Sequence, residues 1–345
     1  MRVVVTGASG NAGTSVLSAL ADEPAVDSVL GVARRAPSLS LPKVEWARAD
    51  VSRDVLEPLL RGADAVVHLA WLIQPSRDGE TLRATNVDGS RRVFEAVAAA
   101  GVPTLVYASS VGAYSPGPKD RAVDESWPTD GIKSSFYSRH KAAVERLLDV
   151  FEAEHPEVRT VRLRPGLIFK RDAASEIRRY FAGPLLPNAL MRRIPVVPDT
   201  PRLRFQAVHS LDVGDAYRRA VVDDGARGAF NVAAEPVLDP ERLASLLGAR
   251  RVPVPARVLR AATALTWRAR LQPTPEGWVD MALGVPIMDT TRAREELGWE
   301  PRHDGGEALL ELLGGMADGD GLATPPLHAG GSRLRELRQG VGARL

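Results

Sequence analysis

The sequence predicts an α/β fold, built as a doubly wound parallel sheet with a smaller C-terminal lobe. Short β-branched runs alternate with helical patterns up to about residue 170, a glycine-rich turn joins the first strand to the first helix, and closely spaced prolines follow residue 170. Strand–helix alternation is typical of parallel sheets, which bind ligands at the carboxyl ends of their strands. A chain of 345 residues exceeds the usual single core, which favours one large domain plus a lobe.

The predicted strands are short and rich in β-branched and apolar residues. They are Arg2–Val5, Ser28–Ala33, Val44–Ala47, Ala65–Leu69, Thr104–Ala108 and Thr160–Arg164. Between them lie segments with apolar positions three and four residues apart, which predicts helices. These segments are Thr14–Ala21, Val55–Leu60, Gly89–Ala100 and Tyr137–Glu154. We therefore expect residues 1–170 to form the main domain.

The pattern changes after residue 170, where closely spaced prolines exclude one regular helix. They are Pro184, Pro187, Pro195, Pro198 and Pro201. We expect residues 171–205 and 236–315 to form the smaller lobe, and residues 206–235 to return to the sheet. Residues 316–345 contain glycine and proline pairs before a basic end, which predicts a flexible tail.

Composition excludes several classes of protein. The 45 basic and 43 acidic residues give a net charge of +2, so we expect no nucleic-acid partner. The absence of cysteine excludes disulfides, thiolate-bound metals and a cysteine nucleophile. His68, His140, His155 and His209 have no metal-ligand spacing, so we expect no metal. Met1 begins no signal-peptide pattern, and no apolar run reaches the roughly 18 residues that span a bilayer, so we expect a cytoplasmic protein.

The glycine-rich turn contains Gly7, Gly10 and Gly13 and lies between the first strand and the first helix. Glycines let a backbone approach a pyrophosphate closely, and the following helix N-terminus supplies free N–H groups. The G-x-x-G-x-x-G spacing is one residue longer than the standard dinucleotide fingerprint. A plain strand–helix connection is the alternative, but the position of the turn favours a dinucleotide site.

Tyr137 and Lys141 are four residues apart in a predicted helix and therefore share one face. A tyrosine normally titrates near ~10, and a neighbouring ammonium favours the phenolate, so this pair could exchange a proton near neutral pH. Ser109 and Ser110 follow the strand that ends at Ala108, where a hydroxyl can reach a substrate oxygen. Taken separately, the helix face could be merely solvated and the serines merely a turn.

Together these motifs resemble the extended short-chain dehydrogenase/reductase family, in its NAD-dependent epimerase/dehydratase group. The resemblance covers roughly residues 1–315 and includes further motifs in order. They are Asp50-Val51, His68-Leu69-Ala70, Asn86-Val87-Asp88-Gly89, Arg164-Pro165-Gly166, Gln206–Val213 and Leu297–Pro301. The resemblance implies an NAD(P)-binding Rossmann domain at residues 1–170, a substrate-binding lobe, and a homodimer through paired helices that include Tyr137–Glu154.

By this resemblance, Ser110 holds the substrate oxygen, Tyr137 is the acid/base, and Lys141 binds the nicotinamide ribose and lowers the pKa of Tyr137. Ser109 could compete with Ser110, which we prefer because it stands three residues before Ala113-Tyr114. The resemblance also implies the cofactor-binding residues. They are Gly7, Gly10, Asn11, Ala12, Gly13, Asp50, Val51, Leu69, Ala70, Asn86, Tyr137, Lys141, Pro165, Gly166 and Ile168.

The end of the second strand departs from the pattern of NAD enzymes. Ala33 stands where such an enzyme usually has an acid that binds the ribose hydroxyls, and Arg34 and Arg35 follow it. A guanidinium group suits a 2′-phosphate through forked, charge-assisted hydrogen bonds. We therefore predict NADP(H) as the cofactor, with NAD(H) as the alternative, because the two arginines could also be ordinary loop residues.

The substrate side lacks the arginines that the resemblance to UDP-sugar members would require. Phe205 stands four residues before His209, in place of one arginine, and residues 276–291 contain no second one. Arg202 and Arg204 could replace them in a different geometry. Trp71 and Phe205, with neighbouring aromatic and aliphatic residues, favour an apolar substrate pocket, although such side chains often fill a core instead.

The sequence therefore predicts an NADP-dependent oxidoreductase that transfers a hydride to or from the carbonyl or secondary alcohol of a small molecule, using Ser110, Tyr137 and Lys141. One alternative is a nucleotide-sugar epimerase or dehydratase with tightly bound NAD(P). Another is a non-catalytic NADP-sensing regulator on the same fold, which the intact Ser-Tyr-Lys set argues against. Residues 253–271 form a basic amphipathic pattern that could rest on a membrane, but we expect it to cover the pocket or a domain interface, without membrane contact.

Overall fold

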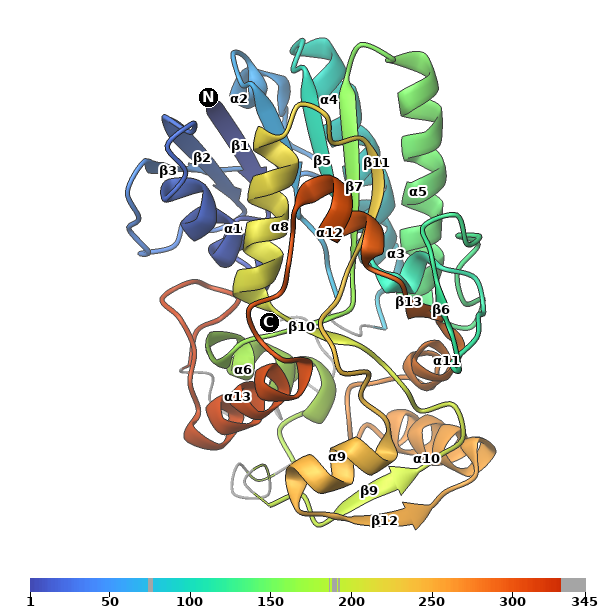
Figure 1. Ribbon diagram of the computed structural model, residues 1–345. Helices are drawn as coiled ribbons and strands as arrows, with labels where there is room; N and C mark the ends of the chain where they lie inside the picture. The colour runs from blue at the N-terminus through green and yellow to red at the C-terminus, as the bar shows by residue number, and fades with distance from the viewer. Residues whose placement is uncertain (74–76, 186, 188–190, 192, 330–345) are drawn as a thin grey trace.

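The computed structural model describes residues 1–73, 77–185, 187, 191 and 193–329. Its centre is a seven-stranded parallel sheet in the order β11-β7-β5-β4-β1-β2-β3 (Figure 1). The strands are β1 (Arg2–Thr6), β2 (Ser28–Ala33), β3 (Val44–Arg48), β4 (Ala65–His68), β5 (Thr104–Ala108), β7 (Arg159–Pro165) and β11 (Gly228–Val232). The predicted doubly wound parallel sheet is confirmed. Its order reverses at β1, which lies between β2 and β4, and ligands of such sheets bind at this switch point.

Alternate residues of the strands pack into two separate cores, one on each face of the sheet. Val3 and Val5 face α1 (Asn11–Ala21) and α8 (Ser210–Val222), whereas Val4 belongs to the core on the opposite face. That second core includes residues of α2 (Glu57–Leu60), α4 (Gly89–Ala99) and α5 (Phe136–Glu154). Burial on both faces explains why the strands appear in the sequence as continuous apolar runs.

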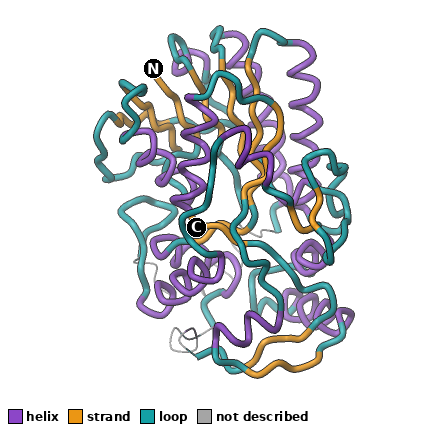
Figure 2. Tube along the Cα trace, in the orientation of Figure 1, coloured by secondary structure: helices purple, strands orange, loops and turns teal. Residues whose placement is uncertain are grey.

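A smaller lobe lies beyond the carboxyl ends of the strands, and Figure 2 shows that it consists mainly of helix and loop. Its elements are α6 (Ala174–Ile177), β9 (Val196–Asp199), α9 (Pro240–Leu247), β12 (Arg250–Pro253), α10 (Ala256–Arg268), α11 (Gly277–Gly284) and α13 (Gly305–Asp318). Two-stranded pairings connect distant parts of the chain. They join β8 (Leu167–Phe169) to β10 (Ala207–His209), β9 to β12, and β6 (Ala122–Val123) to β13 (Ile287–Met288). The remaining α-helices described are α3 (Gly79–Arg83) and α12 (Thr291–Leu297), and short 3-10 or π-helical turns cover Ala84–Asp88, Val111–Ala113, Arg171–Ala173 and Arg178–Ala182.

The segment after α12 packs against α8. Trp299 is fully buried, and its Nε1 donates a hydrogen bond to the carbonyl oxygen of Asp212 in α8 (2.8 Å). His303 Nδ1 lies 3.0 Å from the carboxylate of the same aspartate. These contacts hold α13 close to the sheet and to the lobe at the same time.

The described residues after 316 are packed against the molecule, which differs from the predicted flexible tail. α13 continues to Asp318, and Leu327 is fully buried. Ser175 Oγ donates to the carbonyl oxygen of Asp320 (2.7 Å), and Ser38 Oγ donates to that of Ala323 (3.3 Å). Residues 319–329 therefore bridge α6 and the loop after β2. The sequence did not reveal this packing because glycine- and proline-rich composition gives no information about distant partners. Residues 330–345 lie outside the described residues.

None of the described helices combines the length and the apolar character needed to cross a membrane.

We predict that Leu327→Ala destabilises the protein by about 2–5 kcal/mol, because it removes a fully buried side chain and leaves a cavity. Urea unfolding measures this loss. The control is Leu310→Ala on the exposed side of α13, where the expected change is about 0.5 kcal/mol or less. Equal effects of the two substitutions would contradict the packed arrangement of residues 319–329.

Candidate active site

The glycine-rich turn brings the backbones of β1, α1 and the β4 end into close contact. Gly7 has a φ of +71°, and a Cβ there would lie 2.6 Å from the backbone nitrogen of Ala70. A Cβ on Gly13 would lie 2.5 Å from the carbonyl oxygen of Gly7. A side chain at either position would therefore displace the backbone, so these two glycines are required by the geometry of the turn.

α1 begins at this turn with unpaired backbone donors. Gly10 is the N-cap residue, and no side chain caps the helix. The first N–H groups, those of Asn11, Ala12 and Gly13, have no intrahelical acceptor and lie at the positive end of the helix dipole. This side-chain-free surface fits a pyrophosphate. Asn11 Nδ2 donates to Ile168 (3.0 Å), and Asn11 Oδ1 is buried with no hydrogen-bond partner among the described groups, which leaves an acceptor beside the turn.

Three arginines gather at the carboxyl ends of β2 and β3. β2 ends at the buried Ala33, which pairs in register with Arg48 of β3. The Nε of Arg48 donates to the carbonyl oxygen of Arg34 (3.1 Å). Arg34, Arg35 and Arg48 are all exposed, so their charges are available to an anion. Arg48 was missed from the sequence because its proximity to the other two depends on strand pairing.

The turn after β4 is held in place by Asn86. The backbone nitrogen of Leu69 donates to the carbonyl oxygen of Thr6 (3.0 Å), which places Leu69 and Ala70 next to Gly7. The fully buried Asn86 uses both ends of its amide on Leu72: its Nδ2 donates to the carbonyl oxygen (3.0 Å), and its Oδ1 accepts from the nitrogen (2.7 Å). The structure therefore gives Asn86 a positioning role through this turn.

The other predicted cofactor residues lie at or just beyond the carboxyl ends of β3 and β7. Val51 is buried against Gly89, and the Oδ1 of Asp50 accepts from Ser52 Oγ (2.7 Å). Across the switch point, Pro165 ends β7, and a Cβ on Gly166 would lie 2.6 Å from the carbonyl oxygen of Gln206. Ile168 follows in β8, where its carbonyl oxygen binds Asn11.

Ser110, Tyr137 and Lys141 converge at the carboxyl end of β5. Ser110 Oγ accepts a hydrogen bond from the nitrogen of Gly112 (3.0 Å). A Cβ on Gly112 would lie 2.8 Å from Cε1 of Tyr137, so only glycine lets the phenol approach Ser110 this closely. Lys141 Nζ donates to the carbonyl oxygen of Ala108 (2.5 Å) and lies 3.6 Å from the ring centroid of Trp71. The structure thus brings together the three predicted catalytic side chains.

Burial decides the protonation of Tyr137. It raises the pKa of Tyr137 to about 12, although a hydrogen bond with Ser110 acts in the opposite direction. Burial also lowers the pKa of Lys141 well below its ordinary value, with Glu145 opposing this change. In the protein without cofactor, burial therefore sets the direction of the Tyr137 pKa shift, and its lowering by Lys141 beside an oxidised nicotinamide stays a prediction.

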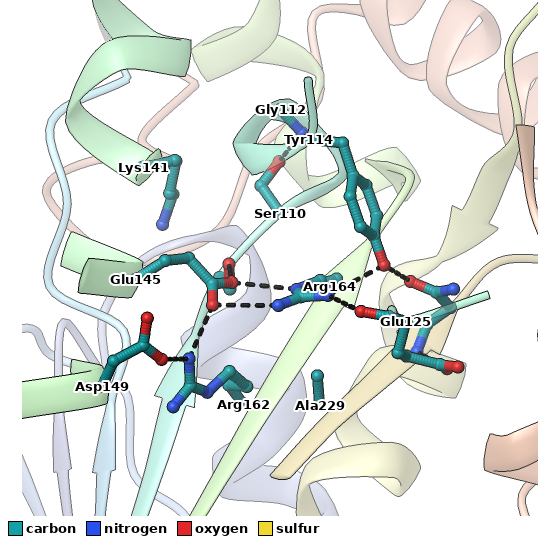
Figure 3. Close-up of polar contacts among 12 residues, drawn as sticks. Ser110, Gly112, Tyr114, Glu125, Lys141, Glu145, Asp149, Arg162, Arg164 and Ala229 are labelled. Atoms are coloured by element: carbon teal, nitrogen blue, oxygen red, sulfur yellow. Dashed lines mark hydrogen bonds and ion pairs between the residues drawn. The ribbon is translucent and has the colours of Figure 1, made fainter. Parts of the chain in front are cut away.

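A buried charge network lies beneath these residues and was missed from the sequence (Figure 3). Glu145 is fully buried on the same face of α5 as Tyr137 and Lys141, and its two carboxylate oxygens accept from Arg164 at 2.9 and 3.0 Å. Arg162 Nη1 donates to the same carboxylate (2.9 Å). Burial acts to raise the pKa of Glu145, but the two guanidinium groups hold it at about 2. The sequence did contain one sign of this role: Glu145 stands four residues after Lys141, which places both on one face of the helix.

This network also distinguishes the two candidate serines. The hydroxyl of Ser109 donates to the carboxylate of Glu145 and is therefore committed to the network. Ser110 is left as the hydroxyl nearest to Tyr137, which supports the choice of Ser110 over Ser109.

Aromatic side chains surround Tyr137 on the substrate side. Its ring centroid lies 6.0 Å from that of Trp71 and 5.1 Å from that of Trp278 in α11. Phe181 contacts Trp278 in turn, with centroids 4.9 Å apart. Trp278 was missed because only the folded lobe brings α11 to the end of β5. These rings make the space around Tyr137 apolar.

Phe205 lies elsewhere. Its backbone pairs with Leu238, and its ring packs against the lobe core that contains Val197 and Leu243. We therefore assign Phe205 to the lobe core and not to the substrate pocket. An aromatic residue in a loop can line a substrate pocket or pack in a core, and the sequence could not distinguish these two positions for Phe205.

Comparison with known proteins agrees with this geometry. The family model described as "NAD dependent epimerase/dehydratase family" matches residues 3–233. The chain belongs to the NAD dependent epimerase/dehydratase family. The similar solved structures, each under 25% identical, include NAD-bound epimerases and a dehydratase and support the same fold.

Similar curated proteins include two uncharacterized proteins of Mycobacterium tuberculosis, each 28% identical to this chain. One match covers 90% of this chain and 30% of the relative, and the other covers 91% and 83%. The chain thus spans about 30% of the length of the first of these relatives. A ketoreductase of Stigmatella aurantiaca, named for 4-hydroxy-2-methyl-3-oxo-4-farnesyl-3,4-dihydroquinoline-1-oxide, is 29% identical over 50% of this chain and 52% of its own length.

Similar solved structures share the fold. A short-chain dehydrogenase/reductase superfamily protein of Agrobacterium tumefaciens with bound NAD is 22% identical, with a TM-score of 0.69 over 92% of this chain and 98% of its own. A UDP-glucuronic acid 4-epimerase of Bacillus cereus, solved with NAD and a fluorinated sugar nucleotide, is 17% identical, with a TM-score of 0.68 over 92% and 99%.

We predict that Glu145→Gln destabilises this family member by about 3 kcal/mol at pH 7, because two buried guanidinium groups lose their carboxylate. The pKa of Glu145 is about 2 in the folded protein against 4.5 for the ordinary group, so its contribution is complete above pH 4.5 and disappears as the pH falls toward 2. Urea unfolding at several pH values measures both effects.

The control is Asp149→Asn, which removes a carboxylate that is 60% exposed and binds the same Arg162. The expected loss is below about 1 kcal/mol. Two results would contradict the assigned network. One is an equal free energy of unfolding for Glu145→Gln and the wild type at pH 7. The other is an equal fall of this free energy in both proteins between pH 4.5 and 2.

Proposed function

We propose that this enzyme is an NADP-dependent oxidoreductase that interconverts an apolar carbonyl compound and its secondary alcohol. The observation that carries this proposal is the position of Tyr137, which lies beside Ser110 and against the rings of Trp71 and Trp278. A proton donor in an apolar enclosure next to a dinucleotide-binding turn is the arrangement that carbonyl reduction requires.

The chain's own residues manage the proton and the substrate oxygen. A bound nicotinamide would supply the hydride in reduction and accept it in oxidation. The raised pKa of Tyr137, about 12, keeps its phenol protonated at neutral pH, so the phenol can donate its proton to the carbonyl oxygen. Ser110 holds the same oxygen by a hydrogen bond. The carbonyl carbon gains a hydride and the oxygen gains a proton, which gives the alcohol and leaves Tyr137 to be reprotonated from solvent. Lys141 would hold the ribose of the cofactor.

The lobe favours an apolar substrate over a nucleotide sugar. Arg202 donates to the carbonyl oxygens of Gly117 (2.7 Å) and Leu283 (3.1 Å), and Arg204 donates to that of Lys119 (3.3 Å). Both guanidinium groups thus bind backbone, which argues against their use as a diphosphate clamp. The similarity to a ketoreductase named for a farnesylated compound points in the same direction.

The carboxyl ends of β2 and β3 favour NADP(H). Arg34, Arg35 and Arg48 are exposed at the strand ends, and Ala33 offers no carboxylate to the ribose hydroxyls. Similar solved structures contain NAD, so the preference of this chain for NADP(H) rests on these four residues. The homodimer through α5 and the cytoplasmic location remain predictions of the sequence.

We predict stoichiometric NADPH oxidation, followed at 340 nm, with a panel of apolar ketones and aldehydes. Tyr137→Phe should lower kcat by about 10²–10⁴-fold while leaving the Kd for NADPH unchanged, because it removes only the transferable proton. Ser110→Ala should have a similar effect on kcat. Ser109→Ala, the matched comparison, should lower kcat less than Ser110→Ala, because its hydroxyl binds Glu145. Cofactor that copurifies and never turns over would favour the epimerase alternative, and retained turnover in Tyr137→Phe would refute the mechanism.

We predict that the wild type uses NADPH in preference to NADH, and that the double variant Arg34→Ala/Arg35→Ala loses this preference. The expected fall in kcat/KM for NADPH is about 100-fold, because two charge-assisted contacts with the 2′-phosphate are lost, while kcat/KM for NADH changes little. Arg61→Ala, which removes a surface arginine paired with Glu57, is the control. A clear NADH preference of the wild type would contradict the assignment.

A further inference from the structure

Helix α10 presents an apolar face to the solvent. Val258 and Leu265 are 50% and 68% exposed, and Ala261, Ala262 and Ala269 are also exposed. With 3.6 residues per turn, these five residues lie on one side of the helix. A surface helix normally places its charged and polar residues on that side.

Specific contacts fix this orientation of α10. Arg260 Nε donates to the carboxylate of Asp280 in α11 (2.9 Å). The guanidinium carbon of Arg77 lies 4.0 Å from the ring centroid of Trp267, and the Nη2 of Arg77 donates to the carbonyl oxygen of Trp267 (2.6 Å). Gln272 Nε2 donates to the carbonyl oxygen of Thr263 (3.1 Å). Arg260, Thr263 and Trp267 lie on the side of α10 opposite Val258 and Leu265, so these contacts leave the apolar face outside.

Positive charge surrounds this apolar face. Residues 250–275 contain six arginines and no acidic residue. Arg257, Arg268 and Arg270 are exposed, and no ion pair joins them to any residue that the structure describes. Leu271, 52% exposed, extends the apolar surface beside them. The occupant of this surface must therefore be both apolar and negatively charged.

We propose that α10 docks the protein on an anionic lipid membrane, with Val258 and Leu265 entering the headgroup–acyl boundary and Arg257, Arg268 and Arg270 contacting lipid phosphates. A bilayer interface supplies an apolar layer and anionic groups at the spacing of a helix lying flat on it. The sequence predicted that residues 253–271 cover the pocket or a domain interface. Either contact would have buried Val258 and Leu265, which the structure leaves exposed.

Other occupants have the wrong charge. A second copy docked through the same face would bring these arginines against their own equivalents. The segment 330–345 carries four arginines, at 333, 335, 338 and 344, against one glutamate, so it is also positively charged. Electrostatic repulsion disfavours both, whereas an anionic bilayer is attracted.

The docked helix adjoins the candidate active site. α10 packs on α11, which carries Trp278 beside Tyr137, and Arg77, which contacts Trp267 of α10, follows Trp71 by six residues. If the proposed function is correct, a lipid-soluble carbonyl compound would reach Tyr137 from the membrane side. Docking itself does not depend on the proposed function.

The test is flotation of the full chain with vesicles of phosphatidylcholine, with and without phosphatidylglycerol. We expect binding only to the anionic vesicles and its weakening by salt. Leu265→Glu should reduce the partition coefficient about tenfold or more, because it removes an inserted apolar side chain and adds a repelled charge. Arg257→Glu/Arg268→Glu should reduce it similarly. Thermal unfolding and NADPH binding check that each variant is folded.

Two controls match these changes at a distance from α10. Val55→Glu alters an apolar side chain that is 75% exposed near α2, at the opposite end of the molecule (Figure 1). Arg227→Glu/Arg294→Glu gives the same change of net charge at two exposed positions, before β11 and on α12. Both control variants should keep vesicle binding.

Three results would overturn the proposal. The wild type fails to bind anionic vesicles, the control arginine pair loses as much vesicle binding as Arg257→Glu/Arg268→Glu, or the lipid-free protein is a dimer that Leu265→Glu dissociates. Turnover of water-soluble ketones by Leu265→Glu reports separately on the proposed function.

Discussion

The carboxylate of Glu145 is the constraint on which the active-site geometry depends. It joins α5, which carries Tyr137 and Lys141, to Arg164 of β7 and to Ser109 at the end of β5. A buried carboxylate is costly unless it is paired, and here each oxygen has guanidinium donors. The helix is therefore held to the strand ends by directional bonds, and the register of the catalytic side chains follows from them.

The lobe determines the chemistry of the space above this network. Trp278 arrives from α11 and, with Trp71, surrounds Tyr137 with apolar surface. The same desolvation raises the pKa of Tyr137 and lowers that of Lys141. The proposed proton donation and the proposed preference for an apolar substrate thus have one physical cause, the burial of these side chains at the end of β5.

The carboxyl edge of the sheet has two ends of contrasting character. Exposed arginines collect at the ends of β2 and β3, whereas aromatic rings gather near α11. The described C-terminal segment bridges the lobe and the loop after β2, which connects both ends in one folded unit. The apolar outer face of α10 adjoins the aromatic end, so the proposed membrane contact and the proposed substrate class are chemically consistent.

The sequence by itself determined the parallel sheet, the glycine-rich turn and the Ser110–Tyr137–Lys141 set, because local periodicity and fixed spacings encode them within one or two adjacent elements. Only the tertiary structure showed the binding of Asn86 to the Leu72 backbone, the ion pairs of Glu145, the place of Phe205 in the lobe core, the packing of Leu327 and the outward apolar face of α10. Each of these depends on a partner far away in the chain. The burial that sets the Tyr137 pKa likewise exists only once the lobe has folded over the ends of the strands.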